Sequence, residues 1–242
     1  MNAPLPLDGV REKLNRAEHN IVNLKKEADS FLDSGDYRAI PDDNENAFRR
    51  ALEYHSTRSV PARFSVLAGE IVYHLRSALD HLVWQLVIAN RATPGHSHEF
   101  PIFKAKPLKK DHFEKKIRGV SPRTAAIIES LQPYRAGTAA DNDPLWILHD
   151  LCRIDKHREL VIVVGTVKLN LQSGGIFIQD GDAELLPRLF GLPSGKDTDY
   201  QLAPQVAFKD FGTRKLQPVF HGLAELLAHV LRIVDKLSDE VT

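Results

Sequence analysis

The chain has 242 residues, of which 26% are charged and 43% are hydrophobic, a composition typical of a soluble globular protein with a sizeable core. Its 32 basic and 32 acidic residues balance to a formal net charge of zero, which disfavours a protein that coats DNA or RNA through a basic surface. The single cysteine, Cys152, excludes an intramolecular disulfide framework and a cysteine-rich zinc site. With neither a signal-like N-terminus nor a membrane-length apolar run, we expect a cytoplasmic protein that has no membrane contact.

The first predicted element is a helix over residues 8–32. Its apolar residues alternate four- and three-residue steps: Val10, Leu14, Ala17, Ile21, Leu24, Ala28 and Phe31. This narrow seam predicts packing against another long helix or a second subunit. The Gly-, Pro- and Asp-rich segment that follows predicts turns, with short strands at 37–40 and 48–56.

Residues 61–90 predict a long core helix. One face carries apolar residues at three- and four-residue steps: Phe64, Leu67, Ile71, Leu75, Ala78, Leu82 and Leu86. Two polar stripes accompany it, one of Glu70, His74, Ser77 and His81, and the other of Tyr73, Arg76 and Asp80. Such chemically specific stripes on a core helix make it the first place to look for a functional site.

Within this helix, Arg76 and His81 form the pattern R-x4-H, which resembles the signature of the HEPN superfamily. The resemblance implies a helical bundle that acts as a metal-independent RNase, with two copies meeting across a dimer interface. It would make Arg76 the group that binds the scissile phosphate and His81 the group that acts on the ribose 2′-OH or the leaving group. We take as supporting residues Glu70, His74, Ser77, Asp80, Asp155, His157 and Arg158.

A wider likeness covers roughly residues 60–165. The segments LRSALDHLVWQL, FPIF (100–103), LQPY (131–134) and DKHR (155–158) together resemble a family of bacterial proteins without assigned function, which implies no chemistry. A purely structural interpretation stays open beside both resemblances. In it, Arg76 and Asp80 form an i, i+4 ion pair, and His74 and His81 are hydrogen-bonded surface or boundary residues.

Residues 91–119 predict a Pro- and Gly-containing loop followed by a basic run and a short helix over 111–117. FPIF is expected to tuck this loop onto the core. His96 and His98 could share a face and bind a metal, but no third ligand accompanies them, so a solvated loop is favoured. Ser121 and Pro122 begin a helix that extends to about residue 131, and 137–142 predict a loop.

A second informative helix is predicted over 143–157. Its apolar stripe, Leu145, Leu148, Leu151 and Cys152, continues onto Asp155. Because an unpaired buried carboxylate is costly, Asp155 should have a cationic or hydrogen-bonding partner. The candidates are Arg158, Arg76, His74 and His81, and the alternative is a purely local contact. His149 and Arg153 are predicted on the surface.

The remaining segments predict strands over 160–170, 175–179 and 200–211, and then a helix over 217–238. Because the strands follow the helices rather than alternate with them, the predicted fold class is α+β, mainly a helical bundle with a small antiparallel sheet. We predict one domain over 1–242, with a helical core from 1–158 and 217–242 and the β-rich segment packed on or inserted into it.

Three classes of function fit this pattern. The first is a HEPN-like endoribonuclease without a metal or other cofactor, with RNA but not DNA as a possible substrate. The second is a non-catalytic interaction or dimerisation module, and in both the chain is expected to form a homodimer. The third is a metal-dependent bundle enzyme that would draw on Glu70, His74, His81 and Asp155. The row of His221, Glu225 and His229 is a further metal candidate, for which a solvated face is favoured.

Overall fold

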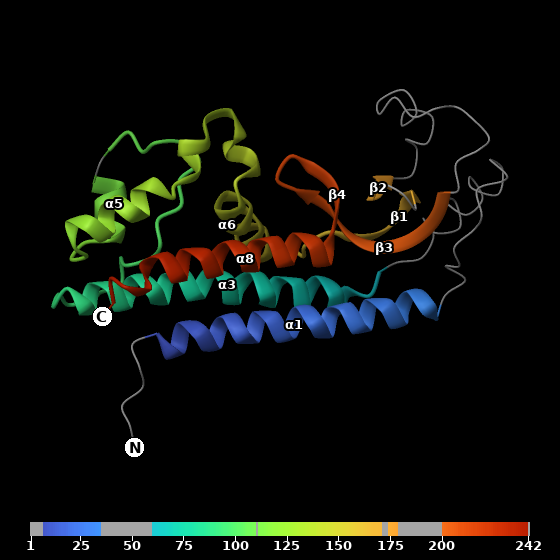
Figure 1. Cartoon of the computed structure of the whole chain (residues 1–242), viewed down its shortest axis with the longest axis horizontal. Coiled ribbons are helices and arrows are strands. Elements are labelled where there is room, and N and C mark those ends of the chain that lie inside the picture. The colour runs from blue at the N-terminus through green and yellow to red at the C-terminus, as the bar shows by residue number, and fades with distance from the viewer. Residues whose placement is uncertain (1–6, 35–59, 110, 171–173, 179–199, 242) are drawn as a thin grey trace, which may run out of the picture.

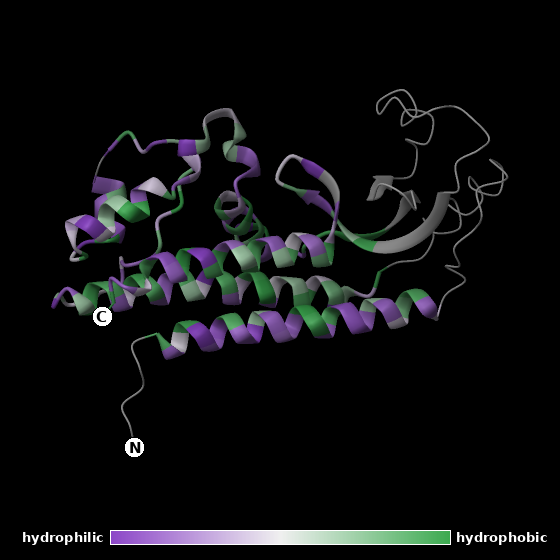
Figure 2. Ribbon diagram, in the orientation of Figure 1, coloured by the Kyte–Doolittle hydropathy of each residue, from purple (hydrophilic) through white to green (hydrophobic). Residues whose placement is uncertain are grey.

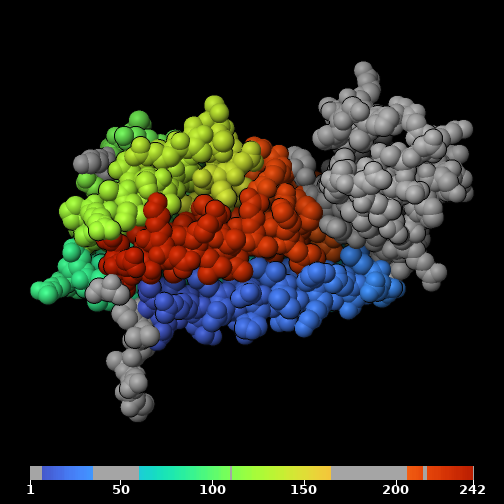
Figure 3. Space-filling view, in the orientation of Figure 1, coloured from blue at the N-terminus to red at the C-terminus, as the bar shows by residue number. Residues whose placement is uncertain are grey.

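Three long helices lie side by side in the computed structural model, which describes residues 7–34, 60–109, 111–170, 174–178 and 200–241 (Figure 1). They are α1 (Asp8–Asp33), α3 (Ala62–Ala89) and α8 (Val219–Ser238). A fourth helix, α6 (Pro144–Asp155), packs against both α3 and α8. On the face seen in Figure 3, α8 and α1 cover α3 except near its C-terminal end. The mainly helical α+β prediction is therefore confirmed.

Helix α3 is the centre of the bundle because three helices pack on it. The predicted stripe is inside, with Phe64, Leu75 and Leu82 all fully buried. A second series of apolar residues, which the prediction did not include, is equally buried: Val72, Leu79 and Val83. The extra buried face exists because α6 and α8 pack on α3 in addition to α1.

Helix α1 packs along α3 through the predicted apolar seam. Green apolar positions alternate with purple polar ones along α1 in Figure 2, as expected for a helix with one buried face. Leu24 and Ala28 of this seam are fully buried. Polar contacts fix the register of the two helices: Arg63 Nε donates to Glu27 Oε2 at 2.6 Å, and Asn20 Nδ2 donates to Glu70 Oε2 at 3.5 Å.

The sheet has four antiparallel strands in the order β2-β1-β3-β4. They are β1 (Ile162–Asn170), β2 (Gly174–Ile178), β3 (Tyr200–Phe211) and β4 (Arg214–Pro218). The first three match the prediction, whereas β4 was missed and α8 begins two residues later than predicted. The reason is that Gln217 pairs with Phe208 in the sheet, and Pro218 is extended, with ψ of 125°.

The β3–β4 turn is fastened to the helical part of the molecule. Gly212 in this turn has a φ of 64°, a conformation that favours glycine, and an added Cβ would lie 2.8 Å from the backbone oxygen of Asp141. The next residue, Thr213, donates both its N–H and its hydroxyl to Asn142 Oδ1, at 3.1 and 2.7 Å. This contact holds the hairpin against the end of the segment 133–142, which precedes α6.

The smaller elements are α4 (Asp111–Lys116), α5 (Pro122–Ser130) and a 3-10 segment, η1 (Pro133–Asn142), which breaks at Gly137. Ser121 caps α5 as predicted, since its hydroxyl accepts the N–H of Thr124 at 3.0 Å. The prediction of a loop over 137–142 is wrong, because these residues form the second part of η1. The strands predicted at 37–40 and 48–56 lie outside the described residues.

Candidate functional site

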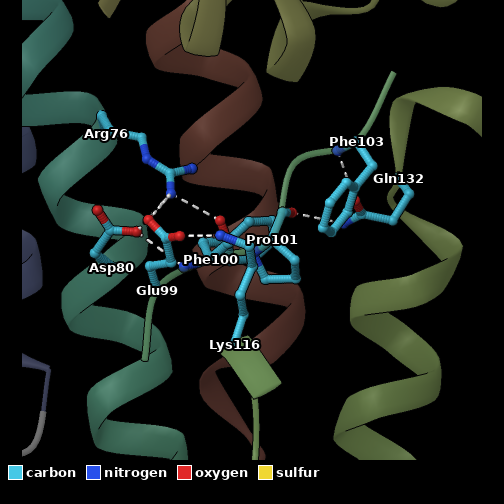
Figure 4. A network of polar contacts seen from close by, with 8 residues as sticks. All are labelled: Arg76, Asp80, Glu99, Phe100, Pro101, Phe103, Lys116 and Gln132. Carbon is cyan, nitrogen blue, oxygen red and sulfur yellow. Dashed lines mark hydrogen bonds and ion pairs between the residues drawn. The ribbon is translucent and has the colours of Figure 1, made fainter. Parts of the chain in front are cut away.

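Arg76 is the centre of a polar network between α3 and the segment 99–103 (Figure 4). Its side chain is only 11% exposed. Its Nη2 donates to the carbonyl oxygen of Phe100 at 2.8 Å, pairs with Asp80 Oδ1 at 2.9 Å and reaches Glu99 Oε2 at 3.5 Å. The predicted ion pair of Arg76 and Asp80 therefore exists, but Arg76 is buried rather than on an exposed helix face.

This network clamps the FPIF segment onto the core, as predicted. Asp80 Oδ1 accepts the N–H of Phe100 at 2.8 Å, so both backbone polar groups of Phe100 bond to α3. The Phe100 ring is fully buried. Farther along, Gln132 Nε2 donates to the Pro101 carbonyl at 2.8 Å, and Gln132 Oε1 accepts the N–H of Phe103 at 3.1 Å. Arg76 and Gln132 thus hold the two ends of this segment.

The positions of Glu99, Lys116 and the nearby His149 could not be predicted from sequence spacing. Lys116, at the end of α4, pairs with Glu99. Burial alone would raise the pKa of Glu99, but the hydrogen bond and charge of Lys116, together with Arg76, lower it below its usual value. His149 of α6 is half-buried, so the prediction that it lies on the surface is wrong. Burial, and next the positive charge of Arg76, lower the pKa of His149. Burial raises the pKa of Asp80 in spite of Arg76.

His81 lies on another side of α3. Five residues at about 100° each place it roughly 140° around the helix from Arg76. The His81 side chain is exposed, and both partial burial and the charge of Lys13 on α1 lower its pKa. Within one chain, the structure does not bring Arg76 and His81 into one cleft. One donor of Arg76, Nη1, is buried without a partner among the described residues.

Three of the predicted supporting residues do meet, in a groove of about 600 Å³ over the N-terminal half of α3. We call it the α3 groove, and its lining includes Arg16, Val66, Gly69, Glu70, Tyr73, His74, Asp155 and Glu159. Glu70 and His74 come from α3, and Asp155 from the last turn of α6. Of the other four, His157 and Arg158 are exposed just beyond the end of α6, Asp80 belongs to the Arg76 network, and Ser77 lies half-buried on α3.

Asp155 does not have the partner that was expected for it. In the described part of the chain it forms no ion pair with Arg158, Arg76, His74 or His81, and burial alone raises its pKa. Instead its carboxylate lies directly against the backbone of Gly69. His74 likewise has a buried Nδ1 that finds no partner among the described residues, and burial, Lys13 and Arg16 lower its pKa.

A row of exposed apolar side chains, which was not predicted from the sequence, runs along α3 beside the polar residues. Val66, Tyr73, Trp84 and Ile88 are 52%, 55%, 43% and 46% exposed. Glu70, Ser77 and His81 lie between them at the same three- and four-residue steps. We call these seven residues the α3 stripe. The spacing of its apolar members along the sequence could have indicated that they share one face of the helix.

Replacing Gly69 with alanine should lower the free energy of unfolding by about 1–3 kcal/mol, a usual cost of overpacking. The added methyl carbon would lie 2.6 Å from Cγ and 2.7 Å from Oδ2 of Asp155. Urea denaturation measures the change. Gly9→Ala is the matched control, because nothing lies within 4 Å of its added carbon, and it should not destabilise. A Gly69→Ala variant as stable as wild type would contradict this contact.

Acidification from pH 7.5 to 5.5 should destabilise the protein. Burial lowers the pKa of His149 and of His229. A histidine whose folded pKa is lowered contributes stability that is complete above the unfolded pKa, near 6.5, and is lost as pH falls below it. Thermal unfolding across this range tests the sign, and His149→Gln should flatten the slope more than the exposed control His157→Gln. An equal slope in both variants would exclude His149 as a source.

Among the described residues, no group of three or more His, Cys, Asp or Glu side chains is placed to hold a metal ion. His98 instead holds its own loop, since Nδ1 lies 2.8 Å from the Gly95 N–H and Nε2 lies 2.6 Å from the Arg118 carbonyl. In the C-terminal row, Glu225 pairs with Arg214 at 2.9 Å.

Comparisons with known proteins add no relative: no family model, no curated protein and no solved structure matches the chain. None of the helices in the described residues has the length and apolar character needed to cross a membrane. The features of the molecule that bear on function are therefore the Arg76 network, the α3 groove and the α3 stripe.

Proposed function

We propose that the protein is a helical self-association module whose interface is the α3 stripe. The observation that carries the proposal is the exposure of four large apolar side chains, Val66, Tyr73, Trp84 and Ile88, on one face of the central helix. Large exposed apolar side chains gathered on one face among polar residues are typical of interaction surfaces. Tyrosine and tryptophan are also the residues that are enriched in such interfaces.

The Arg76 network supports a structural rather than a catalytic use of the R-x4-H pattern. Arg76 Nη2 is committed to Phe100, Asp80 and Glu99, and the side chain is almost fully buried. An arginine that binds a scissile phosphate needs a donor pair open to the substrate. In this proposal Arg76 fixes the segment behind α3, and the face that carries His81 is free for a second copy.

Sedimentation equilibrium over a concentration series tests the proposal. Wild type should approach twice the 27.2 kDa chain mass as its concentration rises. Tyr73→Arg, which places a charge in the middle of the stripe, should stay monomeric. Leu231→Arg is the matched control, because Leu231 is an exposed apolar residue of α8, outside the stripe, and this variant should dimerise. A monomeric wild type, or equal dimerisation of Tyr73→Arg, would overturn the proposal.

A HEPN-like metal-independent endoribonuclease is the second candidate. It is favoured by the exposed position of His81 on α3 and by its lowered pKa, which partial burial and Lys13 produce and which suits a general base at neutral pH. A dimer would be required to supply the rest of such a site. Both proposals require a dimer through the face of α3 that carries His81. They differ in whether that face also cleaves RNA.

RNA cleavage in EDTA separates these two candidates. If His81 is the acid–base group, His81→Ala should lose about 10²- to 10⁴-fold in rate without unfolding, since the side chain is exposed. His157→Ala, also exposed, should cleave like wild type. Absence of cleavage by the wild-type dimer would leave self-association as the function and remove the nuclease.

A further inference from the structure

We infer that the α3 groove binds a small organic cation, whose ammonium group is held between the carboxylate of Asp155 and the hydroxyl of Ser65. The inference goes beyond the proposed self-association, because neither Asp155 nor Ser65 belongs to the α3 stripe and the site needs no second copy. Three features of the described residues support it: a carboxylate without a partner, a buried hydroxyl without a partner, and the charges that surround the groove.

The first feature is the carboxylate of Asp155. It lines the groove from the last turn of α6 and forms no hydrogen bond or ion pair in the described part of the chain. It lies on the backbone of Gly69, which has no side chain to keep α6 away. A carboxylate that is partly buried without a cation or a hydrogen-bond donor is costly to ionise, and burial raises the pKa of Asp155. A ligand that brings a cation would remove this cost.

The second feature is the hydroxyl of Ser65. Ser65 lines the same groove, is only 8% exposed and forms no hydrogen bond through its side chain with any described residue. It precedes Gly69 by four residues, so the two share one face of α3 and lie about 6 Å apart along its axis. A nitrogen about 2.9 Å from each of two acceptors bridges oxygen atoms up to about 6 Å apart. One ammonium group can therefore donate to Ser65 and to the Asp155 carboxylate that lies on Gly69.

The third feature is the charge of the groove. Its charged lining consists of three carboxylates and one guanidinium: Glu70, Asp155, Glu159 and Arg16. A second cation, Lys13 of α1, is close enough to lower the pKa of His74. Neither Arg16 nor Lys13 forms an ion pair with Asp155 among the described residues, so α1 does not supply the missing cation. The groove therefore favours a positively charged ligand.

The donor set suits an organic cation better than a metal ion. In the part of the chain that the structure describes, no three His, Cys, Asp or Glu side chains converge as metal ligands. The groove volume of about 600 Å³ is in the usual range for a small-molecule site. Val66 and Tyr73 give the groove an apolar wall, and the face of an aromatic ring attracts a cation. We therefore assign the ligand to the class of alkylammonium and arylalkylammonium ions.

Titration of the protein with phenethylammonium chloride, followed by backbone amide NMR shifts, tests the site. Wild type should show saturable shifts around Gly69, whereas 2-phenylethanol, a neutral molecule of similar shape, should not produce them. Asp155→Asn should weaken binding about 10- to 100-fold, and Ser65→Ala about three- to tenfold, since each loses an acceptor for the ammonium group. Asp150→Asn is the matched control on α6, because Asp150 pairs with Arg153 and does not line the groove, and it should bind like wild type.

The outcomes separate this site from self-association. Binding of the amine that Asp155→Asn weakens and Asp150→Asn does not supports the inference, whether the protein sediments as a monomer or as a dimer. Equal binding by Asp155→Asn, equal binding of 2-phenylethanol, or no saturable shift with the amine would overturn it. Asp155→Asn should fold, because it removes a charge that lacks a partner, and Ser65→Ala tests the site independently. A wild type that binds the amine but stays monomeric would remove self-association and keep the site.

Discussion

Replacing Arg76 with alanine is expected to lower the free energy of unfolding by about 3–5 kcal/mol, the cost of breaking a buried ion pair by removing one partner. The guanidinium joins the Phe100 carbonyl, Asp80 and Glu99 through one nitrogen. Without it, the half-buried Asp80 carboxylate loses its cation, and the buried Phe100 carbonyl loses its donor. The clamp on the segment that follows α3 would then open at one end.

Urea denaturation of wild type and Arg76→Ala measures this loss. Arg153→Ala is the matched control, because Arg153 pairs with Asp150 at 2.6 Å but is 61% exposed, and exposed pairs contribute about 0–1 kcal/mol. Arg76→Lys should recover only part of the loss, because an ammonium cannot reproduce the planar fork of the guanidinium. A loss below 1 kcal/mol in Arg76→Ala would mean that the network does not hold the segment.

Replacing Trp84 with alanine should weaken self-association by about 2–4 kcal/mol, or roughly 30- to 1,000-fold in Kd, as truncation of a central tryptophan anchor does. The fold should be affected much less, because Trp84 is 43% exposed in the single chain and lies outside the buried core. The loss should therefore be seen mainly in the sedimentation series and not in the unfolding of the isolated chain.

The chain offers a direct control for this prediction, since Trp146 is its only other tryptophan. Trp146→Phe should keep the wild-type Kd and leave Trp84 as the sole tryptophan emitter. Its emission should shift to shorter wavelength as concentration rises and the indole leaves water. An emission maximum that stays constant across the monomer–dimer transition would show that Trp84 lies outside the interface.

Local patterns in the sequence were enough to predict most of the fold. The seam of α1, the apolar face of α3 and the Ser121 cap of α5 each depend on residues a few positions apart, and all were found. Strand β4 was missed because it is defined by pairing with β3 rather than by its own pattern. The 3-10 segment η1 was missed because glycine and proline signals predict turns of several kinds.

The candidate site was less predictable, because it depends on contacts between distant parts of the chain. The ion pair of Arg76 and Asp80 follows from helix spacing, but their bonds to Phe100 and Glu99 and the approach of His149 depend on how the loop and α6 pack on α3. The predicted partner of Asp155 was wrong because it too depends on how α6 packs on α3. Gly69 lets α6 approach α3 so closely that the carboxylate meets backbone rather than a cation.

Hydroxyl-radical footprinting of the wild-type protein at low and high concentration is the most direct test of the α3 stripe as the self-association surface. The predicted result is that Tyr73 and Trp84 lose reactivity as the dimer forms, while the exposed Leu231 of α8 and Leu108 keep theirs. Protection of Leu231 or Leu108, with Tyr73 and Trp84 equally reactive at both concentrations, would contradict the account and place the interface on another face.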